Sequence, residues 1–259
     1  LLGDASSTQS GVIVPKPGDL NTYYLFAVDN NIGASGLTYS RVDMSANGGL
    51  GDIDLTEKNI LLHTPSCEKI TGVVHANGSA IWVIAHSWNT GDYIAYLVTA
   101  TGGVDVANPV ISTVGTIMTG GSSGNVTRGY LKASPGGGKV AVGIEGLNIY
   151  ELYDFDPATG ILSNPLTLTN PIFDDCYGVE FSANENFLYG SERWGVDIHQ
   201  WDITLPTPAA IIASHNVIAT LSPSGGGALQ LAPDLKIYCA RSGQKYLGCI
   251  NDPYTYGAA

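Results

Sequence analysis

A pattern of three short strands recurs five times along this chain and restricts its fold more than any other feature. The clearest copy is the segment 129–165, GYLKASPGGGKVAVGIEGLNIYELYDFDPATGILSNP. Its β-branched and aromatic runs predict strands at 129–134, 139–143 and 149–155, separated by turns rich in Gly, Pro and Asn. Because one antiparallel meander cannot bury both of its faces, it needs neighbours of the same kind.

The other four copies supply those neighbours. Their predicted strands are 11–14, 23–28 and 37–43 in the first copy; 72–75, 81–86 and 93–99 in the second; 178–182, 187–191 and 196–202 in the fourth; and 228–231, 236–240 and 246–251 in the fifth. A further apolar segment between copies suits a fourth, outer strand, at 59–63, 109–117, 165–169 and 210–220. Four strands per unit and a period of about 50 residues predict an all-β β-propeller of four-stranded antiparallel blades, with about five blades represented.

Each third strand closes on a hydrophobic residue followed by a small side-chain acceptor. The acceptors are Asp43, Thr99, Asp156, Asp202 and Asn251. A catalytic role is one interpretation, but such side chains accept hydrogen bonds from backbone N–H groups just beyond them and so start turns. The turn interpretation fits their position and the residues that follow.

Composition favours a single secreted all-β domain spanning residues 1–259. The chain has 33 Gly, 13 Pro and 14 Tyr, only 13 % charged residues, and enough apolar residues (44 %) for a large core. No apolar run approaches the ~18 residues that a membrane-spanning helix needs, so no membrane insertion is expected. The net charge of −12 argues against nucleic acids and anionic membrane surfaces as partners, while it permits cations and carbohydrate.

Four cysteines allow few bridges. Cys239 and Cys249 flank a predicted hairpin with its turn at 242–244, so a disulfide between them is expected if their Cβ atoms approach to ~3.5–4.5 Å. Cys67 and Cys176 both precede an inner strand, two blades apart, and the sequence does not pair them. All four could equally be reduced and buried, because free Cys packs as a small hydrophobe.

Metal and catalytic motifs are scarce. The five histidines show no metal-binding spacing and are interpreted as isolated strand or surface residues: His63, His75, His86, His199 and His215. Among the acidic clusters, only Asp174-Asp175 enters an inner strand, so this pair is the one weak candidate for Ca²⁺. No nucleophile elbow, phosphate-binding loop or dinucleotide fingerprint is present, and no cofactor is predicted.

Alignment of the copies places Val73, Lys132, Glu180 and Gln230 at one equivalent inner-strand position. Inner strands line the channel of a propeller, so the three polar residues are candidate channel-lining residues that could bind a ligand or ion. The alternatives are contact with channel water or a Lys132–Glu180 pair between adjacent blades.

Four aromatic residues lie at or near predicted strand ends: Trp88, Tyr93, Trp194 and Trp201. There they could stack on sugars. Ordinary packing between blades is the alternative for all four.

Several segments carry a resemblance to known proteins. The fourth copy, YGVEFSANENFLYGSERWGVDIHQWDI, resembles the YVTN-type propeller repeat. The segments LLGDASSTQSGVIVPKPGDLNTYYLFAVD, RVDMSANGGLGDI, KITGVVHANGSAIWVIAH and GALQLAPDLKIYCA resemble the propeller region of large secreted proteins of Bacteroidota. In that family the propeller is commonly followed by immunoglobulin-like or PKD-like modules and a type IX secretion sorting domain. The resemblance implies export and an extracellular or cell-surface location, and it carries no catalytic residues.

Further blades and modules are expected to flank this region, in a ring of seven blades. Two functions compete. The first is a non-catalytic extracellular binding or structural module of an adhesin-like or filament-forming protein, with a protein or glycan partner or self-association. The second is a channel-mouth enzyme resembling the propeller lactonases and lyases, with Lys132, Glu180 and Gln230 near the chemistry. Fold alone cannot choose between them, because propellers host both.

Overall fold

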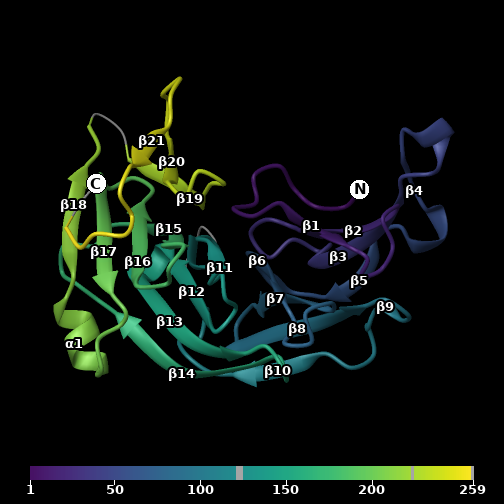
Figure 1. Cartoon of the computed structure of the whole chain (residues 1–259), viewed down its shortest axis with the longest axis horizontal. Helices are drawn as coiled ribbons and strands as arrows, with labels where there is room; N and C mark the ends of the chain where they lie inside the picture. Colours follow the sequence, from purple (N-terminus) through teal and green to yellow (C-terminus); the bar gives the residue numbers. More distant parts are fainter. Residues whose placement is uncertain (121–124, 223–224, 258–259) are drawn as a thin grey trace. The chain divides into compact units, whose positions relative to one another are not determined.

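Antiparallel sheets account for most of the ordered structure. The computed structural model describes residues 1–120, 125–222 and 225–257 (Figure 1). Helix amounts to 7 % of the chain. This confirms the predicted all-β class, since an ordinary globular domain is about one-third helical.

The described strands form five sheets that follow one another along the sequence. The first contains β1 (Gly11–Pro15), β2 (Thr22–Val28), β3 (Leu37–Asp43), β4 (Asp52–Ile53) and β5 (Ile60–His63). The second contains β6 (Ser66–Val74), β7 (Ile81–Ser87), β8 (Asp92–Thr99), β9 (Gly103–Val104) and β10 (Val110–Thr113). The third contains β11 (Leu131–Ala133), β12 (Lys139–Ile144), β13 (Ile149–Asp156) and β14 (Ile161–Leu168).

The last two sheets continue the same pattern. The fourth contains β15 (Cys176–Phe181), β16 (Phe187–Glu192), β17 (Asp197–Asp202) and β18 (Asn216–Thr220). The fifth contains β19 (Gly226–Leu231), β20 (Ile237–Arg241) and β21 (Gly248–Ile250). Consecutive strands pair in order in the third, fourth and fifth sheets, as the three-strand repeat predicts.

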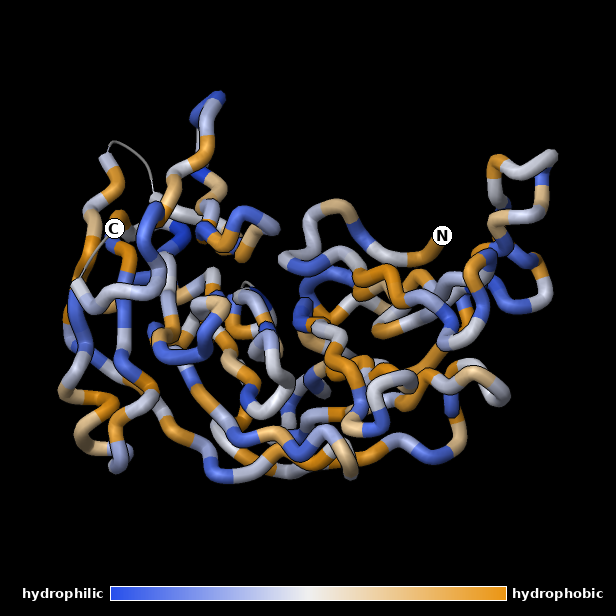
Figure 2. The backbone as a smooth tube through the Cα atoms, viewed as in Figure 1, coloured by the Kyte–Doolittle hydropathy of each residue, from blue (hydrophilic) through white to orange (hydrophobic). Residues whose placement is uncertain are grey.

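Contacts divide the chain into two units. Unit 1 comprises residues 1–128 and 155–163, and unit 2 comprises residues 129–154 and 164–259. The core of unit 1 is centred on Phe26, Val83 and Val98, all fully buried. Unit 2 contains one core cluster around Phe181 and Trp201 and a second around Tyr189 and Leu229. Figure 2 shows the hydrophobic residues that build these cores alternating with hydrophilic ones along the strands.

Turns at the ends of the third strands explain the recurring acceptors. Asp43 accepts hydrogen bonds from the backbone N–H and hydroxyl of Ser45, and Asp202 accepts the same pair from Thr204. Thr99 and Asp156 likewise accept backbone N–H groups two or three residues on. Asn251 differs, because its Oδ1 accepts from Lys236 Nζ at 3.0 Å. The turn interpretation therefore holds for four of the five positions.

The segment expected to form the fourth strand of the fourth sheet is only partly a strand. Its first part lies in α1 (Pro208–Ala213), and β18 begins at Asn216. Thr207 caps this helix by accepting the Ala210 N–H, and Pro208 occupies the first helical position, where its missing N–H costs nothing. The fifth sheet has three described strands, whereas the first and second have five each.

Among the described residues, no helix is long and apolar enough to cross a membrane.

Candidate functional site

The inner strands of unit 2 bring the three polar channel candidates together. Lys132 on β11 extends its Nζ atom to Glu180 Oε2 on β15, at 3.1 Å, and to Gln230 Oε1 on β19, at 2.7 Å. The side chains of Lys132 and Glu180 are only 15 % and 5 % exposed. The three side chains that the alignment placed at one equivalent position are therefore hydrogen-bonded neighbours, and they include the Lys132–Glu180 pair given as the alternative to a ligand site. The fourth member of the aligned set, Val73, is buried on β6 in unit 1.

Both oxygens of the Glu180 carboxylate already accept hydrogen bonds from the protein. Glu180 Oε2 also accepts the Leu231 N–H, and Glu180 Oε1 accepts the Phe181 N–H. Gln230 donates its amide to the Leu231 carbonyl. Lys132, Glu180 and Gln230 therefore link β11, β15 and β19 to one another, and the carboxylate is already occupied by donors from the protein.

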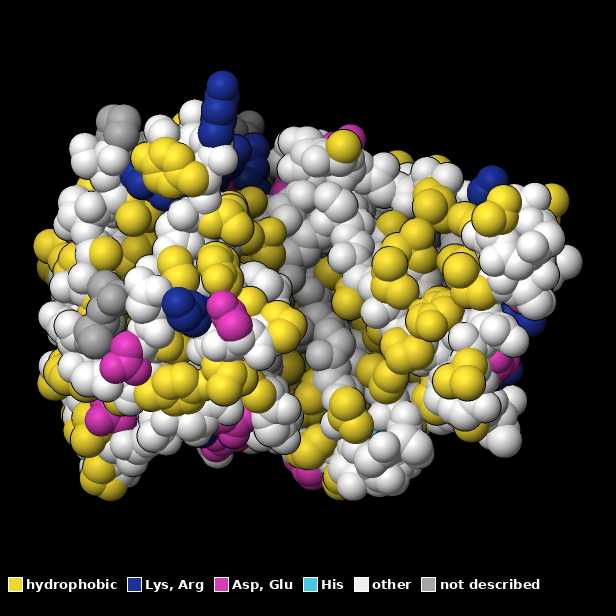
Figure 3. Space-filling view, turned by 45° about the horizontal axis from the view of Figure 1, so that its top comes forward, with side chains coloured by type: hydrophobic (Ala, Val, Ile, Leu, Met, Phe, Trp, Pro, Cys, Tyr) yellow, Lys and Arg dark blue, Asp and Glu magenta, His cyan; other side chains and the backbone are white. Residues whose placement is uncertain are grey.

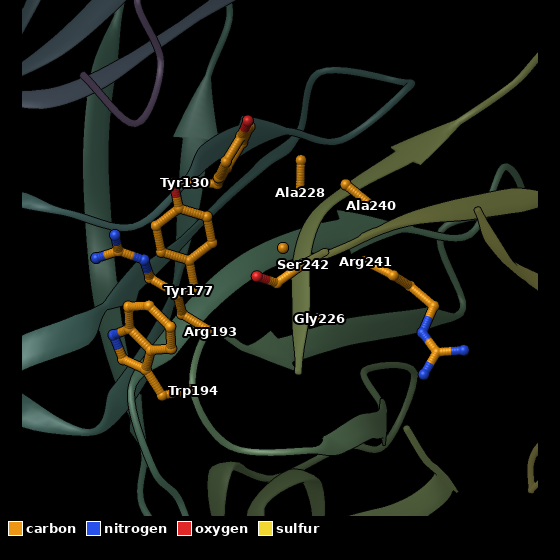
Figure 4. Close-up of a pocket in the computed structure, with 10 residues that line it drawn as sticks. Tyr130, Tyr177, Arg193, Trp194, Gly226, Ala228, Ala240, Arg241 and Ser242 are labelled. Atoms are coloured by element: carbon orange, nitrogen blue, oxygen red, sulfur yellow. The ribbon is translucent and has the colours of Figure 1, made fainter. Parts of the chain in front are cut away.

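A separate pocket of about 370 Å³ opens beside these strands, entirely within unit 2 (Figure 4). This volume is at the small end of the range for small-molecule sites. Tyr130 lies just before β11 and Tyr177 lies on β15. The turn between β16 and β17 supplies Arg193 and Trp194, and the end of β20 leads into Ser242.

Small residues on β19 and β20 form the floor of the pocket. Gly226 pairs with Arg241 across β19 and β20, and the register shift that follows places Gly227 and Ala228 opposite Ala240. Backbone approach on this side is close, because a Cβ atom added at Gly178 on β15 would lie 2.4 Å from the Gly227 carbonyl oxygen. Only glycine permits this packing of two inner strands.

Aromatic rings and a guanidinium group form the opposite wall. Tyr130 and Tyr177 meet edge to face, with ring centroids 5.5 Å apart. The guanidinium carbon of Arg193 lies 5.7 Å from the Tyr177 ring centroid and 4.9 Å from that of Trp194. Both distances lie within the cation–π range. Trp194 ends this stack with 64 % of its surface exposed.

A buried carboxylate fixes the position of Arg193. Its Nη1 atom lies 3.0 Å from Glu145 Oε1 and 3.2 Å from Glu145 Oε2, and Glu145 is 2 % exposed. The Arg193 N–H also donates to the Asp175 carbonyl at 3.0 Å. Main chain and side chain are thus both held, so the Trp194 ring rests on a support that ligand binding does not have to order.

A chain of hydrogen bonds lies behind the same turn. Asn170 Nδ2 donates to His215 Nδ1 at 3.2 Å, so His215 carries its proton on Nε2 and donates to His199 Nδ1 at 3.1 Å. His199 then donates from Nε2 to Glu192 Oε1 at 3.1 Å. Glu192 immediately precedes Arg193, and its carboxylate also accepts the Asp174 and Asp197 N–H groups.

The surroundings of this hydrogen-bonded chain lower the pKa values of His215 and Glu192. Burial, followed by the neighbouring His199, lowers the pKa of His215 to about 4. Burial raises the pKa of Glu192, but hydrogen bonds from His199 and from the Asp174 N–H outweigh it and leave the pKa below its ordinary value. The hydrogen-bonded chain therefore runs from a neutral His215 to an ionised Glu192. Sequence reasoning treated both histidines as isolated, because only strand pairing places His199 on β17 beside the residue that precedes β18.

Comparison with solved structures identifies the architecture. The periplasmic gluconolactonase PpgL of Pseudomonas aeruginosa matches with a TM-score of 0.53 and 14 % identity, over 93 % of this chain and 71 % of that one. The β-propeller domain of Cps50 (Swd1) from Myceliophteria thermophila matches with a TM-score of 0.52 and 12 % identity, over 91 % and 68 %. A putative 6-phosphogluconolactonase from Bacteroides uniformis matches with a TM-score of 0.51 and 11 % identity, over 92 % and 79 %.

The fold is that of a β-propeller. Identities this low establish the fold alone. No family model matches the sequence, and no curated protein matches it either. Function therefore has to be argued from the residues of the propeller itself.

Asp174 and Asp175 do not join a metal-ligand cluster. No group of three or more His, Cys, Asp and Glu side chains suited to a metal occurs in the part of the propeller that the structure describes. The backbone N–H of Asp174 donates to Glu192, and that of Asp175 donates to Asn148. Burial, then the nearby Glu145 and Asp174 carboxylates, raise the pKa of Asp175. The pair thus contributes one backbone donor to Glu192 and one to Asn148.

The predicted Cys239–Cys249 disulfide is not formed in the structure. Cys239 lies opposite Gly248 across the hairpin, and Cys249 lies opposite Tyr238. This offset of one residue places the two thiols on opposite faces of the sheet, because side chains alternate along a strand. Cys67 and Cys176 are also free and buried.

Of the four aromatic residues singled out as sugar-stacking candidates, Trp194 is the one with a largely exposed ring. Tyr93 and Trp201 are buried in the cores of their units, at 0 % and 1 % exposure, and Trp88 is half-buried. Packing therefore explains Tyr93 and Trp201. The flanking pattern Arg193-Trp194-Gly195, two bulky side chains followed by a glycine in a turn, is the signal that marks Trp194.

Proposed function

We propose that this propeller is a non-catalytic binding module of a secreted, cell-surface protein of the adhesin-like or filament-forming type. The observation that carries the proposal is the exposed Trp194 ring, supported by an Arg193–Glu145 ion pair whose acid is buried. A large aromatic ring that is held in water by fixed contacts offers a surface on which a partner can pack.

The chemistry of the pocket supports binding without catalysis. Its described lining residues include no Asp, Glu, His, Cys or Lys side chain. Burial raises the pKa of Tyr130 to about 12, so this phenol stays protonated at neutral pH. General acid–base catalysis needs a group whose pKa lies near the working pH, and the pocket lining offers none.

The surface charge and the proposed location agree with this role. A partner on the cell surface, either a glycan or a protein, would meet a propeller with a net charge of −12. In Figure 3 hydrophobic side chains on unit 2 are interspersed with polar ones, and Lys and Arg side chains gather near its upper edge. The acidic net charge of the chain disfavours binding to nucleic acid.

An enzymatic function is the second candidate. Two of the similar structures are named as a gluconolactonase and a putative 6-phosphogluconolactonase. The Lys132–Glu180 pair, 3.1 Å apart on inner strands, would be the acid and base of such a reaction. The bonds that already occupy Glu180 argue against this, because a catalytic base must have an oxygen available to the substrate.

The two functions are separated by a double variant. Wild type and K132M/E180Q are compared in a screen of lactone and glycosidic substrates, with circular dichroism and thermal melting as controls for folding. The binding proposal expects no turnover above background in either protein, and it expects ligand capture on a glycan or protein array to be equal in both. Turnover by the wild type that disappears in a folded K132M/E180Q protein would establish the enzyme instead.

A further inference from the structure

The pocket beside Trp194 has the chemistry of a saccharide site. We propose that it binds an uncharged sugar, one ring of which stacks on the indole of Trp194 while its hydroxyl groups meet the hydroxyls and backbone of the pocket. This inference rests on the proposed binding function and specifies its ligand. Among the aromatic residues considered for sugar stacking, Trp194 lines this pocket and its ring is supported by Arg193.

The exposed indole of Trp194 provides the stacking surface. An indole that is 64 % exposed and stacked by Arg193 at 4.9 Å offers a flat apolar surface at fixed orientation. A pyranose ring has a complementary face of C–H groups, which bear partial positive charge and are attracted to an aromatic face as a cation is. Because the indole does not have to be ordered on binding, little of the contact energy is lost to entropy.

Hydrogen-bonding groups line the same pocket as the stacking surface. Figure 4 shows Tyr177, Arg193 and Trp194 on one side of the pocket, with Gly226, Ala228, Ala240 and Ser242 on the other. The hydroxyl of Ser242 points toward the aromatic side. The floor of Gly and Ala residues lets a ligand reach the main chain. A sugar, which carries donors and acceptors around its rim, matches this mixture better than an apolar ligand does.

The charges of the pocket favour a neutral sugar. The positive charge of Arg193 is compensated by Glu145, and further acidic groups lie behind the turn at Asp175 and Glu192. The Arg241 guanidinium points away from the pocket in Figure 4 and donates to the Ser222 carbonyl at 2.9 Å. An acidic sugar would therefore find the Arg193 charge already neutralised and the Arg241 guanidinium turned away from it.

The size and shape of the pocket argue against an extended peptide. A volume of about 370 Å³ holds a compact ligand of one or two rings. Proline-rich peptides dock instead along grooves lined by successive aromatic residues. Here Tyr130 and Tyr177 pack edge to face against each other, so Trp194 is the one exposed aromatic face of the wall.

The test is isothermal titration of the whole chain with four neutral disaccharides: cellobiose, maltose, lactose and N,N′-diacetylchitobiose. Digalacturonate and a proline-rich decapeptide serve as comparison ligands. At least one neutral disaccharide should bind, and W194A should weaken its binding about tenfold, equivalent to the loss of one aromatic stack. W194F should have intermediate affinity. I172A, which removes another exposed hydrophobic side chain of unit 2, should bind as the wild type does.

Circular dichroism and thermal melting control for folding, and W194A should pass both because Trp194 is largely exposed. Unchanged affinity in W194A would overturn the inference, as would binding of none of the neutral disaccharides. If digalacturonate or the peptide binds instead and W194A abolishes that binding, the inference of a neutral sugar fails while the binding function stands. Turnover lost in the folded K132M/E180Q protein would instead remove the binding function.

Discussion

At the scale of single residues, the most informative contact is the ion pair beneath Trp194. Glu145 is 2 % exposed, and the side chain of Arg193 is 33 % exposed. A pair between a buried acid and a half-exposed base adds little stability by itself, because desolvation offsets attraction. The ion pair matters because it fixes the Arg193 guanidinium close to the Tyr177 and Trp194 rings. The Glu145 carboxylate also accepts hydrogen bonds from the Arg193 guanidinium, which would otherwise be available to a ligand.

We expect E145Q to loosen this support. Removing the charge leaves Arg193 without its partner, so unfolding free energy should fall by about 1–3 kcal/mol, toward the low end because Arg193 is partly in water. Binding at the pocket should weaken several-fold. Urea denaturation and titration with the bound disaccharide would measure both effects.

The matched control is D154N, which breaks the exposed Lys139–Asp154 pair of the same unit. The D154N substitution should lower the free energy of unfolding by less than about 1 kcal/mol and leave ligand binding unchanged. Equal losses of stability in the two variants would show that burial of Glu145 has no special role.

At the scale of elements, close approach of the inner strands is the feature that places the pocket floor. A Cβ at Gly178 would lie 2.4 Å from the Gly227 carbonyl and the same distance from Ser191 Oγ. We expect G178A to destabilise unit 2 by about 1–3 kcal/mol, because backbone atoms have to move to relieve the clash. Thermal denaturation would measure the loss.

The chain provides a control for this substitution. A Cβ at Gly138, in the turn between β11 and β12, would meet nothing within 4 Å, and its backbone is not left-handed. G138A should therefore match or slightly exceed the wild type in stability. A neutral G178A would mean that β15 and β19 are less closely packed than described.

The histidine chain between β16, β17 and β18 makes this sheet sensitive to pH. The pKa of His215 is about 4 in the folded state and about 6.5 in the unfolded chain, so only the unfolded chain gains a proton between these values. The contribution of neutral His215 is complete above pH 6.5 and falls as pH drops toward 4. His199 and Glu192 face it from β17 and β16, and Asp197 from β17.

We expect H215Q to flatten this dependence. Glutamine can donate to His199 but does not titrate, so the difference in unfolding free energy between pH 7 and pH 5 should be smaller than in the wild type. Urea denaturation at the two pH values measures that difference. An identical pH dependence in both proteins would exclude His215 as a source.

The elements that the sequence predicted are those set by local chemistry. The periodic strands and the turns after Asp43, Asp156 and Asp202 follow from β-propensity and side-chain acceptors. The link between Lys132, Glu180 and Gln230 followed from the repeat register, because equivalent positions on inner strands become neighbours.

What the sequence did not predict depends on register and packing across strands. Cys239 and Cys249 are offset by one residue, and a shift of one residue reverses the face of every side chain. His199 and His215 become neighbours only through the pairing of β17 with β18, which includes a shift in register beside His199. The sequence analysis did not separate the exposed Trp194 from the buried Trp201, and the glycine that follows Trp194 in its turn is the one local signal that distinguishes them.

At the scale of the whole molecule, both units contain a histidine that is neutral when folded. Burial, followed by Lys69, lowers the pKa of His86 in unit 1 to about 3, and His215 plays the same part in unit 2. The melting temperature should therefore begin to fall below about pH 6.5. Carboxylates with lowered pKa values, such as Glu192 and Asp154, add their losses only below about pH 4.5.

Scanning calorimetry from pH 7.5 to 4 would measure this curve. A melting temperature that stays constant down to pH 4.5 would assign acid sensitivity to the carboxylates alone. The predicted ring of seven blades and the type IX export route stay predictions. The sequence of any flanking regions would test both.

Main chain and turn side chains have separate roles in the pocket, and this separation affects how the protein can evolve. Its floor is main chain at Gly226 and Gly227, held by strand pairing, whereas its contact groups are side chains on turns, at Trp194 and Ser242. Turn side chains can be exchanged without altering strand register. Related propellers could thus diversify in what they recognise while keeping one inherited frame, as antibodies do with their loops.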